Sequence, residues 1–128
     1  MTTEKFDTTD AGIEKYYENV VNPSPRVAVA DINDSIESVI YYTAFDGYMY
    51  AKTPECAPLP ENHKLDMHLF CTVMLKCGFT VTGENICVSR GNYNRKMAEQ
   101  MAYEQAISKL WPHFGFELSR RLHREKTA

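Results

Sequence analysis

The sequence lacks several features that would assign it to a specialised class. It has no run of 18 apolar residues, so we expect no membrane-spanning helix. Its first seven residues are polar and lack the apolar core of a signal peptide, which makes the cytoplasm the simplest expected location. None of its four cysteines form a C-x-x-C pair, which argues against a zinc knuckle or a thioredoxin-type motif. No internal repeat or low-complexity segment is visible.

What remains is the composition of an ordinary globular domain. The chain has 128 residues, of which 44% are hydrophobic and 24% are charged, and it contains 8 Tyr, 6 Phe and 1 Trp. This is enough apolar and aromatic surface to build one core. We therefore predict a single domain over 1–128, with an N-terminal helix and linker in 1–30 and an α+β core in 31–128.

Charge is divided unevenly along the chain, although the net charge is only −3. Residues 1–89 carry 6 basic and 13 acidic side chains, whereas residues 90–128 carry 8 basic and 4 acidic ones. A chain with this balance is not a strongly basic nucleic-acid binder, so nucleic acid is not the expected main partner. The absence of a long apolar run leads us to expect no membrane partner. The basic segment that contains Arg120, Arg121 and Arg124 is interpreted as an exposed helix face or a subunit contact.

The first half of the chain predicts short elements separated by proline-rich linkers. Apolar residues at helical spacing predict one helix over 10–21 and a second over 34–42. The aromatic stretch 41–50 contains Asp46-Gly47, which predicts a turn between two half-buried strands. The prolines in 22–25 and 53–60 predict extended connections.

The second half of the sequence predicts the sheet and the long helix around which the fold is built. Alternation of apolar and polar residues over 67–88 predicts a hairpin or meander that turns at Cys77-Gly78 and is broken or bulged at Gly83. A long helix follows, capped by Asn92 or Asn94, with small residues at 98, 102 and 106 that allow close approach to a sheet. Trp111-Pro112 predicts its end, and a short helix is expected over 116–126. The predicted fold class is α+β, with a small antiparallel sheet packed on a long helix and short helices at both ends.

The junction at 89–96 is the main candidate for a binding site. It connects a predicted strand to a helix N-terminus, where free N–H groups and a partial positive charge favour anions. Arg90, Arg95 and Lys96 add positive charge there, and the ring of Tyr93 offers a stacking face. The functional interpretation is a pocket for a phosphate-bearing nucleotide, and the alternative is a solvated, capped helix start.

Other residues that could carry chemistry do not form a recognisable pattern. The spacing of His63 and His68 would place them on opposite faces of a strand, so we predict no metal site. Cys71 and Cys87 lie in apolar runs and are interpreted as buried free thiols. No nucleophilic triad, carboxylate pair or phosphate loop is recognisable. We therefore predict no catalytic residues, no cofactor and no enzymatic activity.

A family resemblance extends over roughly residues 34–122. The stretch 72–88, with its Gly78-Phe79 turn and Cys87-Val88 strand end, is followed by Asn92-Tyr93 and then by the helix stop Trp111-Pro112. In this order these motifs resemble a family of small tailed-phage proteins first catalogued as conserved reading frames. The arrangement also resembles the phage anti-Thoeris sponge proteins, which hold a cyclic ADP-ribose isomer, and in some members cyclic oligonucleotides, without cleaving it.

The resemblance implies roles for two residues and a state of assembly. Phe79 would stack on a base, and Asn92 would donate to a ribose or phosphate of the ligand. The sponge proteins assemble as dimers or hexamers, which implies a homo-oligomer, and Met97 and Met101 are expected to leave apolar surface for a partner. This chain departs from the family pattern at Ser89-Arg90, where an acidic residue and a proline are usual, and over 103–106, where an arginine is often found.

Together these observations predict a phage anti-defence protein that sequesters a nucleotide immune signal in the host cytoplasm. The predicted ligand-binding residues are Phe79, Ser89, Arg90, Asn92, Tyr93 and Arg95, and the expected partner is a small nucleotide signalling molecule. Two alternatives stay open. One is a protein-binding inhibitor of a host defence enzyme, acting through the acidic half of the chain. The other is a DNA-associated phage accessory protein, acting through Arg120 and Arg121.

Overall fold

The computed structural model describes residues 5–22 and 24–127, so Met1 to Glu4, Pro23 of the predicted first linker, and Ala128 lie outside the described residues. Contacts divide the chain into two compact units, which we describe separately: a sheet unit of residues 35–111, and a helical unit of residues 1–34 with 112–128. The single domain over 1–128 stays a prediction. Within the described part of the chain, no helix is both long and apolar enough to cross a membrane.

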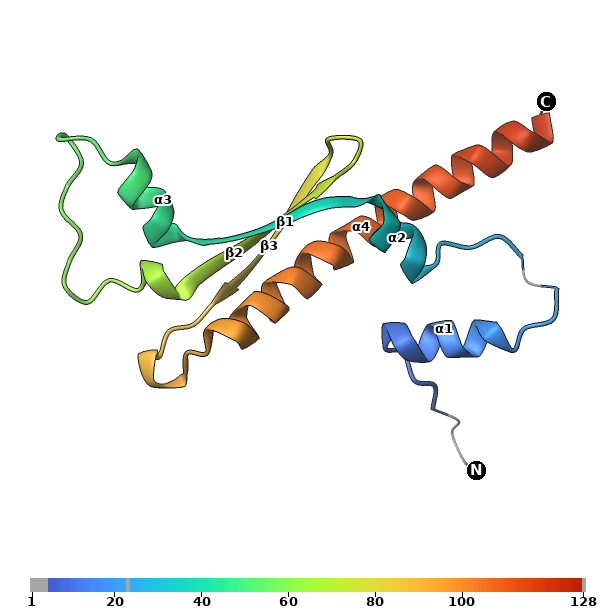
Figure 1. Cartoon of the computed structure of the whole chain (residues 1–128), viewed down its shortest axis with the longest axis horizontal. Helices are drawn as coiled ribbons and strands as arrows, with labels where there is room; N and C mark the ends of the chain where they lie inside the picture. Colours follow the sequence, from blue (N-terminus) through green and yellow to red (C-terminus); the bar gives the residue numbers. More distant parts are fainter. Residues whose placement is uncertain (1–4, 23, 128) are drawn as a thin grey trace. The chain divides into compact units, whose positions relative to one another are not determined.

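The sheet unit is built on three antiparallel strands in the order β1-β2-β3 (Figure 1). The strands are β1 (Ile36–Thr43), β2 (His68–Leu75) and β3 (Thr80–Ile86). The β2–β3 hairpin turns at Gly78, which adopts a left-handed φ of 92° that favours glycine, as the sequence predicted. The predicted hairpin over 67–88 is therefore confirmed.

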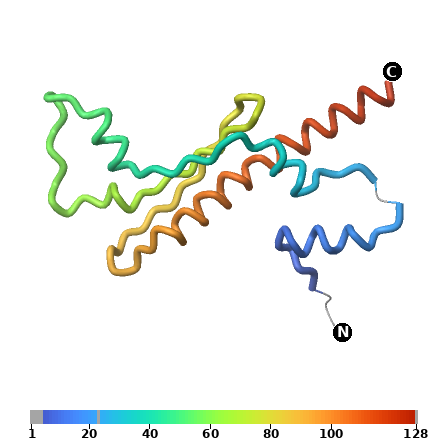
Figure 2. Tube along the Cα trace, viewed as in Figure 1, coloured from blue at the N-terminus to red at the C-terminus, as the bar shows by residue number. Residues whose placement is uncertain are grey.

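One face of the sheet packs on the first part of α4 (Arg95–Thr127), as the trace in Figure 2 also shows. Every second residue of β2 is buried, beginning with Leu69 and ending with Leu75. The helix contributes Leu110 and three buried alanines at positions 98, 102 and 106. Because a buried strand face meets a helix stripe of small residues, the two backbones approach closely. The predicted α+β fold with a long helix on a small antiparallel sheet is confirmed.

Gly83 makes that close approach possible, and the predicted break or bulge at this residue is wrong. Gly83 stays in register opposite Cys71 in an uninterrupted β2–β3 ladder. A Cβ atom at this position would lie 2.0 Å from the carbonyl oxygen of Ala102 and 2.5 Å from the amide nitrogen of Ala106. The glycine is therefore required by helix packing and not by strand geometry.

Two predictions in the first half of the chain are corrected. Residues 34–42 do not form a helix, because α2 (Val29–Ser35) ends where β1 begins. Residues 44–51 form α3 (Ala44–Ala51) and not the predicted turn at Asp46-Gly47. Helix α3 is started by a capping box, in which the Thr43 hydroxyl accepts from the Asp46 amide and the Asp46 carboxylate accepts from the Thr43 amide, at 3.0 and 2.9 Å.

The predicted stop at Trp111-Pro112 is also wrong, because α4 continues through Pro112 to Thr127. The residues of the predicted final helix over 116–126 belong to this same helix. A proline inside a helix removes one backbone hydrogen bond and crowds the preceding turn, but it does not have to end the helix. The boundary between the two compact units nevertheless falls at this residue.

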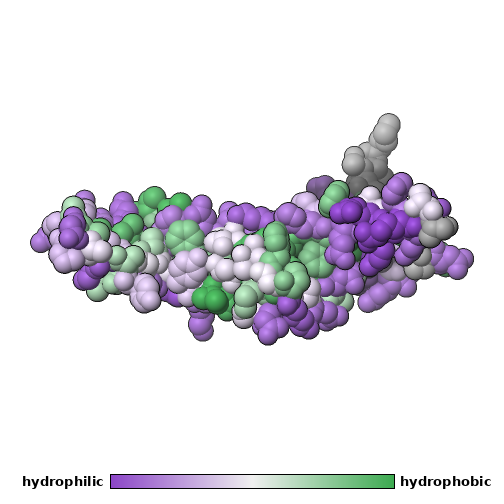
Figure 3. Space-filling view, turned by 90° about the horizontal axis from the view of Figure 1, so that it is seen from above, coloured by the Kyte–Doolittle hydropathy of each residue, from purple (hydrophilic) through white to green (hydrophobic). Residues whose placement is uncertain are grey.

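Apolar side chains also remain at the surface, where green patches lie among hydrophilic side chains (Figure 3). Met97 and Met101 are 55% and 49% exposed, so the predicted apolar surface at these positions is present. Burying such surface against another molecule is favourable in proportion to its area.

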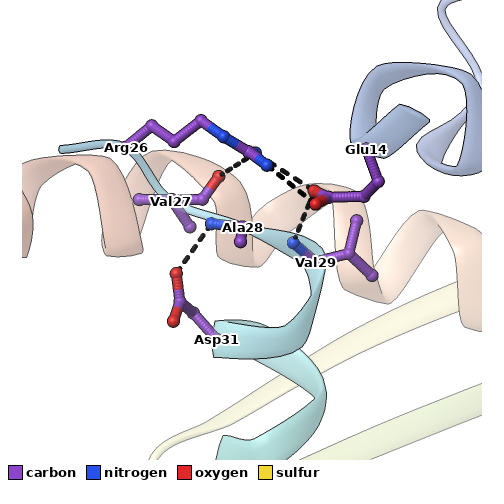
Figure 4. A network of polar contacts seen from close by, with 6 residues as sticks. All are labelled: Glu14, Arg26, Val27, Ala28, Val29 and Asp31. Carbon is purple, nitrogen blue, oxygen red and sulfur yellow. Dashed lines mark hydrogen bonds and ion pairs between the residues drawn. The ribbon is translucent and has the colours of Figure 1, made fainter. Parts of the chain in front are cut away.

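The helical unit contains α1 (Asp10–Glu18), α2 and the last part of α4. A polar network joins α1 to the segment that leads into α2, with the Arg26 guanidinium facing the Glu14 carboxylate (Figure 4). Arg26 donates two hydrogen bonds to Glu14, at 2.7 and 3.1 Å, and the Val29 amide donates a third at 3.0 Å. Glu14 thereby joins α1 to the start of α2 and the residues just before it.

These contacts predict a pH-dependent attachment of α1. The hydrogen bonds from Arg26, followed by that from Val29, lower the pKa of Glu14 from 4.5 to about 2. A lowered pKa in the folded state means that the stabilisation is complete above pH 4.5 and is lost as the pH falls toward 2. We expect the hydrogen-exchange protection of the Val29 amide to fall over this interval. Glu14→Gln should abolish the pH dependence, whereas Glu18→Gln, on the same helix, should preserve it. Equal protection at pH 5 and pH 2 would contradict this prediction.

Candidate functional site

The junction between β3 and α4 forms an irregular segment with one short turn of 3₁₀-helix, η2 (Arg90–Asn92). Asn94 caps α4, because its side-chain oxygen accepts a hydrogen bond from the Met97 amide at 3.0 Å. Of the two predicted caps, Asn94 is therefore the one used. Asn92 belongs to the turn before the helix, where its backbone amide donates to the Ser89 carbonyl oxygen at 3.0 Å.

A groove of about 300 Å³ lies along this junction. Its lining comes from the end of β3, the connecting segment and the first two turns of α4: Asn85, Ile86, Cys87, Val88, Ser89, Asn92, Tyr93, Asn94, Met97, Ala98 and Met101. Three of the predicted ligand-binding residues, Ser89, Asn92 and Tyr93, are thus brought together. The volume is at the lower end of the range for small-molecule sites.

The two predicted arginines lie beside the groove but do not line it. Arg90 donates two hydrogen bonds to the Asp66 carboxylate, at 2.6 and 3.0 Å, and a third to the His63 carbonyl oxygen at 3.4 Å. This guanidinium lowers the pKa of Asp66 below its ordinary value. Arg95 pairs with Glu99 one turn along α4, at 3.1 Å. Both cations are thus compensated by carboxylates, and the groove itself is lined by uncharged side chains.

Phe79 lies apart from the other predicted residues. Its carbonyl oxygen accepts from the Leu75 amide in the turn between β2 and β3, and its side chain is 45% exposed. The groove is at the opposite end of β3, which has seven residues. At about 3.3 Å per residue, the strand separates Phe79 from the groove by about 20 Å.

Sequence reasoning predicted exposed apolar surface at Met97 and Met101 but missed that Ile86 and Val88 join them along the groove. Ile86 at the end of β3 and Val88 in the segment that follows are exposed, as are Met97 and Met101 at the start of α4. Met97 and Met101 lie one turn apart on α4 and share a face, whereas Val88 lies two residues beyond Ile86, the last residue of β3. This spacing was visible in the sequence, but it is equally typical of residues buried in a core.

Tyr93 carries a further feature that the sequence does not reveal. Its hydroxyl oxygen is buried, and the structure gives it no hydrogen-bond partner among the described residues. A buried polar group left unpaired costs about 1–3 kcal/mol. Tyr93 thus lines the groove while its hydroxyl oxygen is shielded from solvent and lacks a partner among the described residues.

The other candidate residues do not converge on a second site. The His63 ring stacks on Phe45 at 5.2 Å between centroids, whereas His68 pairs with Glu84 at 2.6 Å. Among the described residues, no group of three or more metal-ligating side chains is close enough to hold an ion. Cys71 is a buried free thiol, as predicted, and Cys87 is half-buried, with its thiol donating to the Ser89 carbonyl oxygen.

The fold and the groove define a small α+β protein with an uncharged surface groove at a strand–helix junction. The chain belongs to the Phage protein (N4 Gp49/phage Sf6 gene 66) family, whose sequence profile matches residues 27–122. Comparison with curated proteins gave no match, and comparison with solved structures gave none either. The predicted membership of a phage protein family is confirmed.

Proposed function

We propose that this phage protein is an anti-defence protein that sequesters a nucleotide immune signal in the host cytoplasm. The signal would be a cyclic ADP-ribose isomer, a cyclic oligonucleotide, or both, bound without cleavage. The observation that carries the proposal is the groove of about 300 Å³, which three of the predicted ligand-binding residues line. The resemblance to the sponge proteins supports the same activity.

Sequestration requires tight binding, because the protein must hold the signal below its working concentration. A dissociation constant of about 1 nM corresponds to about 12 kcal/mol of binding free energy. A stacked base and two or more charge-assisted phosphate contacts would supply much of this. The groove offers the polar and apolar contacts, and Arg90 beside it offers the charge.

Arg90 can contact a phosphate only if it exchanges the Asp66 carboxylate for the ligand. We therefore expect Arg90→Ala to weaken nucleotide binding, whereas Asp66→Asn, which frees the guanidinium, should strengthen it. The expected change is about 10- to 100-fold in each direction, the range for a hydrogen bond to a charged group. Calorimetric titration of the two variants checks both signs. Equal affinity in Arg90→Ala, Arg95→Ala and the wild type would remove the arginines from the site.

The separation of Phe79 from Asn92 constrains how the ligand is held. A base and its own ribose are joined by one bond, so groups that contact them lie far closer together than about 20 Å. If Phe79 stacks on the base and Asn92 donates to the ribose or phosphate, they come from two copies of the chain. The proposed site is therefore shared within a homo-oligomer.

The experiment that tests the function is calorimetric titration of the purified protein with cyclic ADP-ribose isomers, cyclic dinucleotides and cyclic trinucleotides. After binding, each sample is heat-denatured and the released compound is identified by chromatography. Tight binding and release of an intact nucleotide would support sequestration. Release of a cleaved product would make the protein an enzyme. Absence of binding to every compound would favour inhibition of a host protein, which a pull-down would then test.

A further inference from the structure

We propose that the free edge of β1 pairs with β1 of a second copy of this chain, so that two three-stranded sheets join into one continuous antiparallel sheet. Among the strands that the structure describes, β1 and β3 form the two edges of the sheet (Figure 1). The backbone groups of one edge are covered and those of the other are open. The pairing is independent of nucleotide binding.

The outer edge of β3 is closed by side chains of α4. The backbone amide of Glu84 donates to the side-chain oxygen of Gln105 at 2.7 Å, and the ammonium of Lys109 donates to the carbonyl oxygen of Thr82. A helix that covers an edge in this way keeps the strand from pairing with another chain. β1 is therefore the edge at which a second chain can extend the sheet.

The outer edge of β1 is open. The Lys76 amide donates to the Ser35 carbonyl oxygen, so even-numbered residues along β2 direct their backbone groups toward β1. These residues lie opposite even-numbered residues of β1, and the odd-numbered Val39 and Tyr41 consequently direct their backbone groups to the free edge. Within the part of the chain that the structure describes, no hydrogen bond reaches the outward groups of Val39 and Tyr41.

The side chains of β1 do not protect this edge. Edge strands of soluble proteins are commonly blunted by lysine, by proline or by a bulge. β1 contains one charged residue, Glu37, and no lysine or proline. Its irregularity lies between Ile36 and Ser38, before the open stretch. Ile40 is 50% exposed there, so covering this edge would also bury apolar surface.

A second copy of β1 complements this edge. With a two-fold axis at Ile40, Val39 of each copy lies opposite Tyr41 of the other, and each such pair exchanges two backbone hydrogen bonds. Ile40 meets Ile40 of the second copy, which buries both side chains. The two Glu37 side chains lie about 20 Å apart along the strands, so no like charges meet. The strand is thus self-complementary in this register.

The β1 interface is distinct from the one across which Phe79 and Asn92 would share a ligand. In each chain β2 lies between β1 and β3, so pairing through β1 leaves the β3 side of the sheet free. If both interfaces form, the assembly holds more than two copies.

Amide hydrogen exchange of the full-length protein tests the pairing directly. The Val39 and Tyr41 amides should be protected in the wild type and lose about 10- to 100-fold of that protection in Ile40→Lys. The Tyr42 amide faces β2 and should stay protected in both proteins, which makes it the internal control. Unprotected Val39 and Tyr41 amides in the wild type would overturn the inference.

Sedimentation of Ile40→Lys tests the assembly. The variant should weaken association between copies about 10- to 100-fold, because two isoleucines lose their burial and two ammonium groups face each other. Thr80→Lys adds the same charge at an exposed position of β3 and should leave the mass of the assembly unchanged. Equal masses for the wild type and Ile40→Lys would contradict the pairing.

Ile40→Cys tests the register without adding a charge. The background is Cys56→Ser with Cys77→Ser, which removes the exposed native thiols. Cα atoms of a directly opposed, non-hydrogen-bonded pair lie about 4.5 Å apart, within the range of a disulfide. Mild oxidation should therefore link two copies through position 40, whereas Thr80→Cys in the same background should give no linked product. Failure of Ile40→Cys to link the copies would overturn the proposed register.

Discussion

Gly83→Ala is expected to unfold the sheet unit or to destabilise it by about 3 kcal/mol or more. The new Cβ atom would lie 2.0 Å from the Ala102 carbonyl oxygen and 2.5 Å from the Ala106 amide nitrogen. Both are backbone atoms of α4, so no side-chain rotation relieves the clash. The helix must move away from β3, and overpacking that displaces a buried element costs about 1–3 kcal/mol and occasionally more. Loss of the buried contacts of Ala102 and Ala106 adds to this cost.

Denaturant unfolding of Gly83→Ala measures the effect, and Gly47→Ala is the matched control. Gly47 lies inside α3, and a Cβ atom there meets nothing within 4 Å. Replacing an unstrained helical glycine by alanine stabilises by about 0.5–1 kcal/mol. We therefore expect the two alanine variants to move stability in opposite directions. Wild-type stability in Gly83→Ala would mean that β3 and α4 are not packed as described.

The second half of the fold could be predicted because its signals agree at every level. In β2, residues alternate strictly between core and surface, and the following turn has the glycine that its left-handed φ favours. In α4, the three alanines recur at the spacing of one helix face. Local preference and tertiary packing thus favour the same structure, which is when sequence patterns are most informative.

β1 could not be predicted because its spacing resembles that of a helix. The register with β2 shifts between Ile36 and Ser38, and such an irregularity interrupts the alternation expected of a strand. Among the strands that the structure describes, β1 is an edge strand paired with β2, and exposed and half-buried residues follow one another along it without a period of two. The apolar residues at 36, 39 and 40 consequently matched a helical stripe.

The turn and the helix end were mispredicted because tertiary structure and capping outweighed single-residue signals. Asp46-Gly47 favours a hairpin turn, but Thr43 and Asp46 satisfy two free amides at a helix start, which a turn would leave unpaired. Pro112 disfavours helix by about 3 kcal/mol, yet α4 has 33 residues over which other interactions offset that cost.

The candidate site was predicted in part. The strand–helix junction, Ser89, Asn92 and Tyr93 follow from the order of the elements, which the sequence reveals. The pairing of Arg90 with Asp66 does not, because these residues are 24 positions apart and meet only through the register of the folded chain. A count of cations along a sequence cannot distinguish a free guanidinium from one already bound to a carboxylate.

Phe79→Ala and Asn92→Ala are each expected to weaken nucleotide binding about 10- to 100-fold, because stacking on one base, or one hydrogen bond left unpaired, contributes about 1–3 kcal/mol. If the two residues act from different chains, a mixed assembly behaves differently from either variant alone. In a dimer of Phe79→Ala with Asn92→Ala, one shared site carries both substitutions and the other carries neither. Co-expression of the two variants should therefore restore wild-type affinity at half of the sites.

The two variants carry different tags and are co-expressed, so that purification on both tags selects the mixed assembly. Calorimetry of this assembly should give a binding stoichiometry near half that of the wild type. The matched control is the Phe79→Ala/Asn92→Ala double variant, in which every chain carries both substitutions. This control should bind the nucleotide at no site. If the mixed assembly forms but binds as weakly as the separate variants, the two residues do not share a site across chains. Because about 20 Å of strand separates them within one chain, at least one of the two would then lie outside the nucleotide site.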